Sequence, residues 1–535
     1  MSGGLKPAAQ HHLIFSIEER NMIAIELIDI SKRFPGVLAN DHISISVEKS
    51  KIHAIVGENG AGKTTLMNLI YGLDQPTSGT IKVNGKIVHF SRSKDAIHAG
   101  IGMVHQHFML VNKMTVMENI VLGQEPGSVF YLDRKKALKE TRELSDIYKL
   151  SVDPTAIVRD LNVTMRQRVE ILKILYRKAE ILIFDEPTAT LTPQETKELC
   201  SVLKNISTLG KTIIFISHKL AEVMDVADRI TVIRLGKVIG TVNKVEIDIP
   251  KLTQMIVGRK IHLGGGEKKR LLDTEVVIKA ENIEFDGGAY RHSLHNICFE
   301  ARRGEILGIA GVDGNGQEEL IAMLSAKLKP DSGSLTYLGE NLLKMPLKTL
   351  KDMGYAIIPE DRQKDGLVLS FSISENLILG FQRRAIFRKY RYLANKDAIF
   401  KNAQERKEEF DIRTNDIMAP VQTLSGGNQQ KLILAREIHF VKDIVLAIQP
   451  TRGLDIGAME FVQNTLVQQR NSGKTIILFS LELDEIMMLS DRIAVLYKGV
   501  IVDIVENKGL TNEDLGYMML NGEPLLNREN YVVKN

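Results

Sequence analysis

The feature that most constrains the fold is an internal repeat. The segment IHAIVGENGAGKTTL, beginning at Ile52, returns as ILGIAGVDGNGQEEL from Ile306, an offset of 254 positions (306 − 52). A later pair, LNVTMRQRVEI from Leu161 and LSGGNQQKLIL from Leu424, lies 263 positions apart (424 − 161). The difference of nine positions (263 − 254) is an insertion in the second copy. The chain therefore contains two copies of one domain, and a fold assigned to one copy applies to the other.

The repeat sets the domain boundaries that we expect along the 535 residues. We expect a poorly ordered N-terminal extension over residues 1–21 and the first copy over 22–258. The second copy covers 276–510, and a C-terminal tail follows over 511–535. Residues 259–275 contain three consecutive glycines and then four charged side chains, which predicts a short, flexible, solvated linker.

Each copy has the sequence pattern of a parallel sheet covered by helices. Short apolar runs at 52–56, 181–184 and 212–216 lack the alternation of a half-exposed strand, and helix-like segments separate them. Strands of this kind are buried on both faces. Residues 107–170 are amphipathic with helical spacing and predict a helical subdomain. The expected fold class is therefore α/β, with a mostly parallel sheet core and a helical subdomain in each copy.

Composition argues against several classes of protein. The 70 basic and 66 acidic residues nearly balance, so the net charge of +4 does not favour nucleic acid as a partner. Cys200 and Cys298 are far apart and have no metal-ligand spacing, and we expect both to be small buried side chains. No apolar run reaches the ~18 residues that a membrane-spanning helix needs. We therefore expect any action at a membrane to be peripheral.

A phosphate-binding loop follows the apolar run at 52–56. It has the complete P-loop spacing and consists of Gly57, Glu58, Asn59, Gly60, Ala61, Gly62, Lys63, Thr64 and Thr65. The glycines let consecutive backbone N–H groups face phosphate oxygens, Lys63 reaches the β- and γ-phosphates, and Thr64 binds magnesium. A glycine-rich turn arising by chance would not also stand between a strand and a helix. We therefore expect the first copy to bind ATP and Mg²⁺.

Two acidic residues end a second apolar run, ILIFDEP. We expect Asp185 to hold Mg²⁺ through water and Glu186 to polarise the attacking water as a catalytic residue. Paired acids are also common at solvated ends of strands. Their position after a P-loop favours the catalytic interpretation.

The motif LSGGNQQ from Leu424 separates this chain from other P-loop proteins. Ser425, Gly426, Gly427 and Asn428 open a predicted helix, where a hydroxyl and two amide N–H groups form an anion-binding nest. In another setting a Ser-Gly-Gly is only a turn or an N-cap. Here the motif resembles the LSGGQ signature of ABC ATPases, in which two domains face each other head to tail. The resemblance implies that the signature of one domain closes over the ATP held by the other.

The resemblance assigns three further residues of the first copy. It places Phe34 where an aromatic ring stacks on adenine, although an aromatic at such a position is about as often a core or edge residue. Gln106 corresponds to the glutamine loop, with a catalytic role and a contact to magnesium. His218 corresponds to the catalytic histidine that contacts the γ-phosphate. Outside this set of motifs, a lone glutamine or histidine is usually a structural or surface residue.

The second copy lacks the residues that carry this chemistry. Gln317 and Glu318 stand at the positions of the P-loop lysine and threonine. Ile448 and Gln449 replace the acidic pair, and Leu481 replaces the histidine. Loss of the lysine and addition of a carboxylate weaken phosphate binding electrostatically.

The signature of the first copy is altered as well. Asn162 replaces its serine and Thr164 replaces a glycine, so a side chain crowds the place where the backbone must approach phosphate. Head-to-tail sharing would put all of these losses in one composite site and leave the other intact. We therefore expect one competent site, made of the first P-loop and the second signature, and one degenerate site.

This asymmetry resembles the tandem ATPases of bacterial monosaccharide and nucleoside importers. The similarity covers nearly the whole chain, including IIPEDR from Ile357, with Glu360 in the glutamine-loop position, and QPTRGLDIGA from Gln449. The segment GIGMVHQHFMLV, from Gly100, is more similar to ATPases of purine nucleoside importers that work with basic-membrane-protein lipoproteins. Ribose and galactose remain open as alternative substrates.

The resemblance also implies partners and a location. It implies an ATPase at the cytoplasmic face of the cell membrane, held by two transmembrane permease subunits. An extracytoplasmic solute-binding lipoprotein would act on it indirectly, and no nucleic acid would bind.

Two other classes of protein remain as alternatives. A soluble tandem ABC protein acting on the ribosome normally has two intact signatures and a long charged helical linker, whereas this linker is a few residues around three glycines. A nucleotide-gated binding module would keep the motifs but show little turnover, which an assay of phosphate release would detect.

Overall fold

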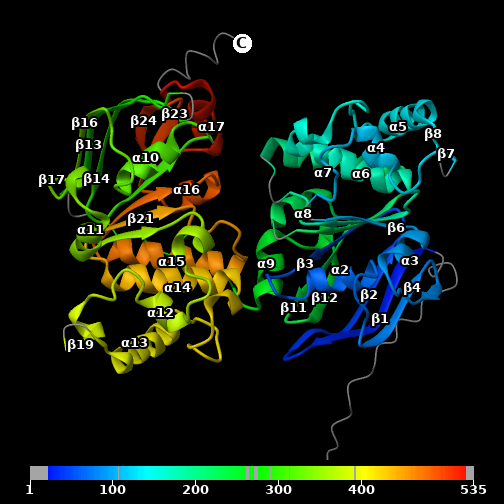
Figure 1. The fold of residues 1–535 in the computed structure, drawn as a ribbon, viewed down its shortest axis with the longest axis horizontal. Coiled ribbons are helices and arrows are strands. Elements are labelled where there is room, and N and C mark those ends of the chain that lie inside the picture. The colour runs from blue at the N-terminus through cyan, green and yellow to red at the C-terminus, as the bar shows by residue number, and fades with distance from the viewer. Residues whose placement is uncertain are drawn as a thin grey trace, which may run out of the picture. The chain divides into compact units, whose positions relative to one another are not determined.

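Each copy of the repeat folds around two sheets. The structure, a computed structural model, describes residues 22–105, 108–128, 131–188, 191, 193–217, 219–260, 264, 266, 268–269, 275–288, 291–312, 314–390 and 393–525. The chain divides into two units, unit 1 over residues 1–261 and unit 2 over residues 262–535. Figure 1 shows strands and helices mixed in both units, so the α/β expectation is confirmed.

Unit 1 has a six-stranded sheet in the order β12-β11-β3-β10-β9-β6, parallel except for the β11–β12 pair, and a four-stranded antiparallel sheet in the order β2-β1-β4-β5. Its strands are β1 (Ile23–Phe34), β2 (Val37–Glu48), β3 (Ile52–Val56), β4 (Ser78–Val83), β5 (Lys86–Val88), β6 (Ile101–Val104), β7 (Gly127–Ser128), β8 (Tyr131–Leu132), β9 (Ile181–Asp185), β10 (Thr212–Ile216), β11 (Arg229–Arg234) and β12 (Lys237–Asn243). Its helices are α2 (Lys63–Ile70), α3 (Ser93–His98), α4 (Val116–Val121), α5 (Arg134–Tyr148), α6 (Val163–Tyr176), α7 (Pro193–Thr208), α8 (Leu220–Val226) and α9 (Ile249–Val257).

Unit 2 repeats this topology, with a six-stranded sheet in the order β18-β21-β22-β15-β23-β24 and a four-stranded sheet in the order β14-β13-β16-β17. Its strands are β13 (Val276–Phe285), β14 (Leu294–Arg302), β15 (Ile306–Ala310), β16 (Ser332–Tyr337), β17 (Glu340–Asn341), β18 (Tyr355–Ile358), β19 (Arg388–Lys389), β20 (Leu393–Ala394), β21 (Ile444–Ile448), β22 (Thr475–Phe479), β23 (Arg492–Tyr497) and β24 (Val500–Glu506). Its helices are α10 (Gln317–Leu324), α11 (Leu347–Met353), α12 (Ile373–Leu377), α13 (Lys396–Glu409), α14 (Gly426–Phe440), α15 (Ile456–Asn471), α16 (Leu483–Leu489) and α17 (Asn512–Asn521).

The central strands form where the sequence is continuously apolar. Strands β3, β9 and β10 are five residues long and buried at every position, as the runs at 52–56, 181–184 and 212–216 predict. Helix α2 covers one face of this sheet and packs between it and the antiparallel sheet. Leu66 and Leu69 of α2 share a single core cluster with Ile45 of β2 and Ile214 of β10. The helix that follows the P-loop is therefore held on two sides.

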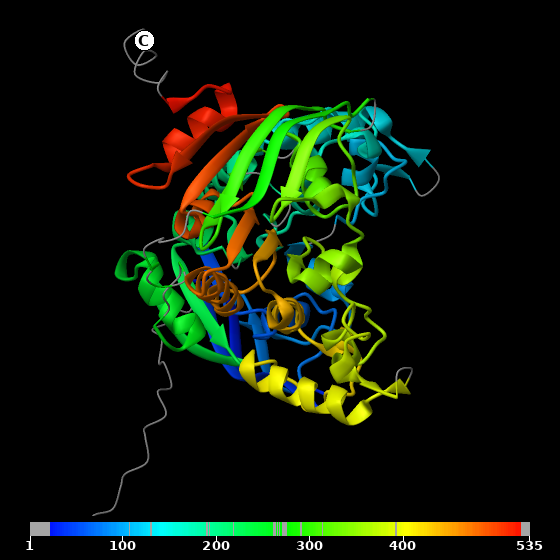
Figure 2. The ribbon, with the colours of Figure 1, turned by 90° about the vertical axis from the view of Figure 1, so that its left-hand side faces the viewer.

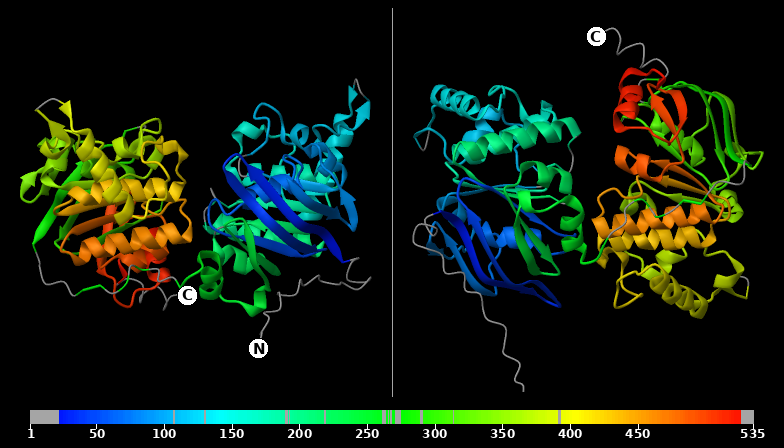
Figure 3. Two further views of the ribbon diagram at one scale, coloured as in Figure 1. Left: turned by 90° about the horizontal axis from the view of Figure 1, so that it is seen from below. Right: turned by 180° about the vertical axis from the view of Figure 1, so that it is seen from behind.

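A helical subdomain completes each unit at the end away from the antiparallel sheet. In unit 1 it contains α4, α5 and α6, as expected for residues 107–170, together with the short β7–β8 hairpin. Figure 3 shows these cyan helices far from the dark blue strands of the same unit. In unit 2 the yellow helix α13 lies at the opposite end from the green strands of its antiparallel sheet (Figure 2). None of the described helices is both long and apolar enough to cross a membrane.

Unit 2 extends beyond the predicted boundary at residue 510. Helix α17 lies inside the segment 511–535 that we expected to be a tail. Its side chains Leu515 and Met518 are fully buried, and it packs against β23. Helix α17 is the counterpart of α9 at the 263-position offset, so the same closing helix ends both units.

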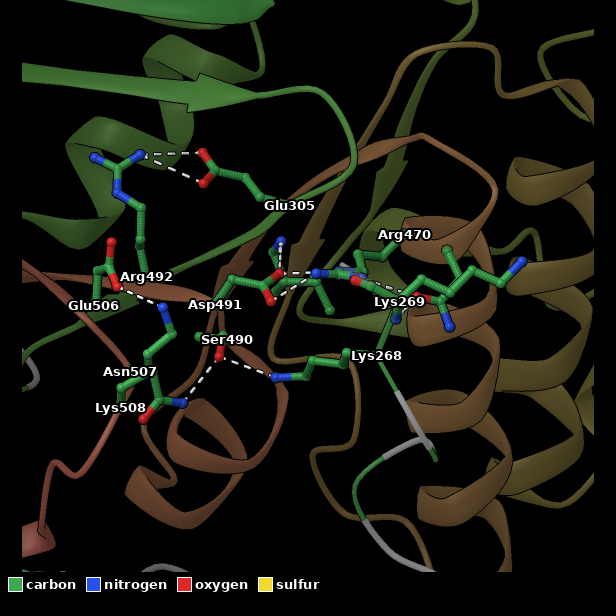
Figure 4. Close-up of polar contacts among 12 residues, drawn as sticks. Lys268, Lys269, Glu305, Arg470, Ser490, Asp491, Arg492, Glu506, Asn507 and Lys508 are labelled. Carbon is green, nitrogen blue, oxygen red and sulfur yellow. Dashed lines mark hydrogen bonds and ion pairs between the residues drawn. The ribbon is translucent and has the colours of Figure 1, made fainter. Parts of the chain in front are cut away.

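Part of the linker is fixed to unit 2, which departs from the expectation of a flexible, solvated segment. The ammonium of Lys268 donates to the carbonyl of Ser490 (3.0 Å), and the N–H of Lys269 donates to Oδ1 of Asn471 (3.1 Å). Arg470 donates to the carbonyl of Lys269 and forms an ion pair with Asp491 at 2.9 Å (Figure 4). Burial lowers the pKa of Lys268. Groups more than 200 positions away in the sequence hold Lys268 and Lys269 in place. The charged composition of the segment therefore does not indicate that it is flexible.

One of the two cysteine expectations is wrong. Cys200 is buried, whereas Cys298 is exposed. The alternation of β14 explains the difference, because Ile297 and Phe299 on either side of Cys298 take the buried positions.

Candidate functional site

The glycines of the P-loop in unit 1 are required by its geometry. Gly60 and Gly62 have φ values of 81° and 98°, in the left-handed region that side chains disfavour. A Cβ on Gly57 would lie 2.2 Å from the carbonyl oxygen of Ile233, and one on Gly62 would lie 2.3 Å from that of Ala39. The loop therefore folds with its backbone closely surrounded, as phosphate binding through N–H groups requires.

Lys63 directs its charge into this loop. It is the first residue of α2 and is buried, and its ammonium donates to the carbonyls of Gly57 (2.7 Å) and Glu58 (2.9 Å). Thr64 is exposed and Thr65 is half-buried in the first turn of the helix. The lysine, the helix N-terminus and the loop amides thus converge on one position, which is suited to a polyphosphate.

Of the remaining loop residues, Asn59 is exposed and Ala61 is buried. The N–H of Ala61 donates to the carbonyl of Glu58 (3.1 Å). The amide of Asn40 donates to the carbonyl of Gly62 (3.1 Å) and ties strand β2 to the loop.

Asp185 lies beside the lysine and threonine of the P-loop. It ends β9 and is 6% exposed. Burial and then the negative charge of Glu186 raise the pKa of Asp185 to about 6, while the charge of Lys63 and a hydrogen bond with Thr64 oppose the rise. A buried carboxylate whose ionised form is disfavoured is suited to binding a cation, which would supply the missing positive charge.

Glu186 occupies a strained backbone position. Its φ is 49°, and its N–H donates to the carbonyl of Ile216 at 3.0 Å. A left-handed residue other than glycine costs ~1–2 kcal/mol, and such residues concentrate at functional sites. Gln449, the counterpart in unit 2, keeps the same geometry, with φ of 46° and an N–H bond to the carbonyl of Phe479 at 2.8 Å. Unit 2 therefore retains the backbone of this turn without its carboxylate.

Phe34 has the exposure that stacking on a base requires. It ends β1 opposite Val37, and its ring is 39% exposed with the ammonium of Lys32 4.9 Å from the ring centroid. The same hairpin reaches the P-loop a few residues later, through Asn40. The assignment of Phe34 to adenine stays a prediction.

Gln106 and His218 lie outside the described residues. The strands that precede them, β6 and β10, are the two neighbours of β9 in the sheet. Ile216 at the end of β10 pairs with Asp185, so the chain leaves the sheet beside the acidic pair. The catalytic roles of Gln106 and His218 stay predictions.

The intact signature of unit 2 forms the start of a long helix. Ser425 is the exposed N-cap of α14, and its hydroxyl accepts from the N–H of Asn428 (3.4 Å) and from the side-chain amide of that residue (2.9 Å). Gly426 and Gly427 form the first turn, and a Cβ on Gly427 would lie 3.0 Å from Cβ of Ala458. This N-terminus carries backbone amides and a hydroxyl, the groups that an anion needs.

The altered signature of unit 1 differs in a way that the sequence analysis missed. Asn162 caps α6 by accepting from the N–H of Met165 (2.8 Å), so the helix start itself is preserved. Thr164 turns its hydroxyl toward Glu195. Val163, at the position of Gly426, is 38% exposed and adds a second side chain to this helix start. Comparing the two repeats position by position would have revealed it.

The loop of unit 2 that corresponds to the P-loop is filled by its own side chains. The side-chain oxygen of Asn315 accepts from the N–H of Lys498 (3.1 Å). Glu319 is buried and accepts from the N–H of His292 (3.2 Å). The amide of Gln317 lies over Gly311, 2.7 Å from the position of a Cβ there. These substitutions add a buried carboxylate where the loop of unit 1 has a threonine, and they disfavour a polyphosphate.

Comparisons with known proteins agree with this geometry. The ABC transporter family model matches residues 40–189 and 294–452, once in each unit. The nucleoside import ATP-binding protein NupA of Lactococcus lactis is 44% identical over 502 residues, 94% of this chain and 99% of that protein. The guanosine import ATP-binding protein NupO of Bacillus subtilis is 46% identical over 495 residues, 92% and 97% of the two chains.

A solved structure of a distant protein has a similar fold over most of this chain. The archaeal ribosome recycling factor, solved with a ribosomal stalk protein, matches 87% of this chain and 87% of its own with a TM-score of 0.58 and 19% identity. At that identity the likeness concerns the fold alone. The sequence matches over both units and nearly full length are the stronger finding, and the chain belongs to the ABC transporter family as a tandem ATPase related to the import ATP-binding proteins.

Proposed function

We propose that this chain hydrolyses ATP at one composite site and thereby drives the uptake of purine nucleosides. The P-loop, Asp185 and Glu186 of unit 1 would hold the nucleotide, and residues 425–427 of unit 2 would close over its γ-phosphate. The observation that carries the proposal is the distribution of intact parts. Unit 1 has a phosphate loop with a buried lysine, but its signature helix starts with added side chains. Unit 2 has a signature helix that starts with two glycines, but its loop lacks the lysine.

Head-to-tail pairing of the two units explains why each has one intact and one altered part. If each unit closed on itself, Lys63 would face the exposed side chain of Val163, and Gly426 would face a loop that contains Gln317 and Glu319. Neither site would be complete. Pairing of opposite parts makes one complete site and one in which both halves are degraded.

The residues present fit a magnesium ion bound with the nucleotide. The hydroxyl of Thr64 and the carboxylate of Asp185 lie together, and burial and the charge of Glu186 raise the pKa of Asp185 although Lys63 is close by. Magnesium bound there would neutralise charge on the β- and γ-phosphates. Glu186 would orient the attacking water and accept its proton, while Lys63 and the loop amides fix the phosphates for in-line attack.

The relatives support the transport role and the substrate class. Both named relatives are import ATP-binding proteins, one for nucleosides and one for guanosine, and this chain matches each over nearly its full length. We infer a peripheral position on the cytoplasmic face of the membrane, two permease partners and an indirect link to a solute-binding lipoprotein. Ribose- or galactose-type sugars are the alternative substrates.

A matched pair of variants tests the composite site. Ser425 and Asn162 are both N-caps whose side chain accepts one backbone N–H, so Ser425→Ala and Asn162→Ala should cost similar stability, about 1 kcal/mol. Only Ser425→Ala should lower the ATPase rate, because only Ser425 belongs to the competent site. Equal effects of the two variants on the rate would contradict the proposal.

The substrate requires a separate experiment. The chain would be co-purified with its permeases and solute-binding protein, and ATPase activity would be measured with guanosine, adenosine, ribose or galactose added. Stimulation by nucleosides alone is the expected result. Stimulation by a sugar alone would assign the alternative, and co-purification with ribosomes instead of permeases would reject the transport role.

A further inference from the structure

A cationic side chain lies against the signature turn of unit 2. Arg362 follows β18 in the segment that corresponds to the glutamine loop, at the start of a helical turn over Arg362–Gly366. A Cβ on Gly426 would lie 2.8 Å from Nη2 and 3.3 Å from Cζ of Arg362. The guanidinium therefore occupies the space that glycine leaves at position 426.

The guanidinium uses only part of its hydrogen-bonding capacity. Nη1 donates to the carbonyl of Arg452 (3.0 Å), and Nε is buried with no hydrogen-bond partner. Among the described residues no carboxylate forms an ion pair with Arg362. Glu360 pairs with the side chain of Arg452 instead, and Asp361 Oδ1 accepts two backbone N–H groups that follow it. Burial lowers the pKa of Arg362, while the negative charge of the neighbouring Asp361 opposes the shift without forming an ion pair.

Unit 1 has no equivalent of this pair. At the 254-position offset Arg362 corresponds to Phe108, and at the 263-position offset Gly426 corresponds to Val163. The arginine and the glycine that accommodates it thus occur together, in the unit whose signature is intact. Both are absent from the unit whose signature is altered.

We propose that Arg362 is a further catalytic residue, whose guanidinium binds the γ-phosphate of the ATP held by unit 1 when the signature of unit 2 closes over it. This inference rests on the proposed composite site. The signature itself offers neutral donors, the hydroxyl of Ser425 and two amides, whereas the guanidinium adds a full positive charge with planar, paired N–H groups. An arginine supplied in this way to the transferring phosphoryl group of other P-loop NTPases is worth ~10³–10⁵ in kcat.

The test compares three variants of Arg362 with a matched control in the full-length chain. Arg362→Gln keeps a polar amide but loses the charge, and we expect its kcat to fall by at least ~10²-fold. Arg362→Lys keeps the charge without the planar fork and should fall less. Methylguanidinium added to Arg362→Ala should restore at least about tenfold of the lost rate, because it can enter the vacated space. Arg413→Gln is the control, since its side chain is 73% exposed and only its N–H touches Asn428 of the signature; its rate should not change.

The outcomes separate this inference from the proposed function. If Ser425→Ala lowers the rate and Arg362→Gln keeps more than about half of it, the composite site stands and the role of Arg362 is rejected. If both variants keep full activity, the composite site and the role of Arg362 are both wrong. If Arg362→Gln and Arg362→Lys lose activity in step with a lowered unfolding temperature, and methylguanidinium restores nothing, Arg362 is a structural residue and the inference is overturned.

Discussion

Replacing Asp185 with asparagine should stabilise unit 1 while removing a ligand for magnesium. The carboxylate is 6% exposed, and its pKa is raised from 3.8 to about 6, chiefly by burial. Because the folded-state pKa lies above the unfolded value, ionisation of Asp185 disfavours the folded state. The penalty is nearly absent below pH 3.8, grows between pH 3.8 and 6, and is constant above pH 6. At 1.36 kcal/mol per pKa unit, the free energy of unfolding at pH 7.5 should rise by up to about 3 kcal/mol in the variant.

Denaturant unfolding of the nucleotide-free chain, in EDTA and at two pH values, measures this effect. The transition of unit 1 should move to higher denaturant at pH 7.5. Near pH 4 the gain should be only about 0.5 kcal/mol, because the carboxylate is then protonated in the folded state and only about half ionised in the unfolded state. Magnesium and ATP should stabilise the wild type more than the variant. An equal gain at both pH values, or no gain at pH 7.5, would refute the argument that the buried charge is the source of the instability.

The remaining predictions concern turnover, the loop and the closing helix. Glu186→Gln should lower kcat by ~10²–10⁴ while ATP still binds, whereas Gln449→Ala should leave most of the rate, as phosphate release would show. Gly57→Ala should abolish ATP binding measured by calorimetry, because its Cβ would meet a backbone oxygen at 2.2 Å; at Gly60, where nothing lies within 4 Å, alanine should cost only the ~1–2 kcal/mol of a left-handed residue. Leu515→Ala should destabilise unit 2 by about 2–5 kcal/mol in thermal unfolding, since Leu515 is fully buried in α17; a change near zero would mean that α17 is not part of the fold.

The sequence was sufficient for the core of each unit. A strand buried on both faces consists mainly of apolar side chains, so apolar runs such as 181–184 locate strands such as β9 directly. The P-loop could also be predicted from the sequence, because its glycines are needed for the local backbone conformation. Gly62, for example, has a left-handed φ. Such requirements depend on neighbours in the sequence or on burial alone.

Features that depend on distant partners could not be read in this way. Lys268 has the composition of a solvated linker, yet the carbonyl of Ser490 accepts its hydrogen bond from 222 positions away. The contact between Arg362 and Gly426 joins two motifs that are far apart in the sequence. In each case the missing information was a tertiary contact.

The left-handed backbone at Gln449 has a consequence for redesign. A turn of this kind is the hardest part of such a centre to install, because it must be supported by the surrounding sheet, and here it is already in place. Restoring the acidic pair of unit 2 would thus require exchange of the side chains at Ile448 and Gln449 on an existing backbone, apart from the changes that its loop and the signature of unit 1 also need. Relieving the left-handed torsion at Gln449 would instead stabilise unit 2 and leave it unable to hydrolyse ATP.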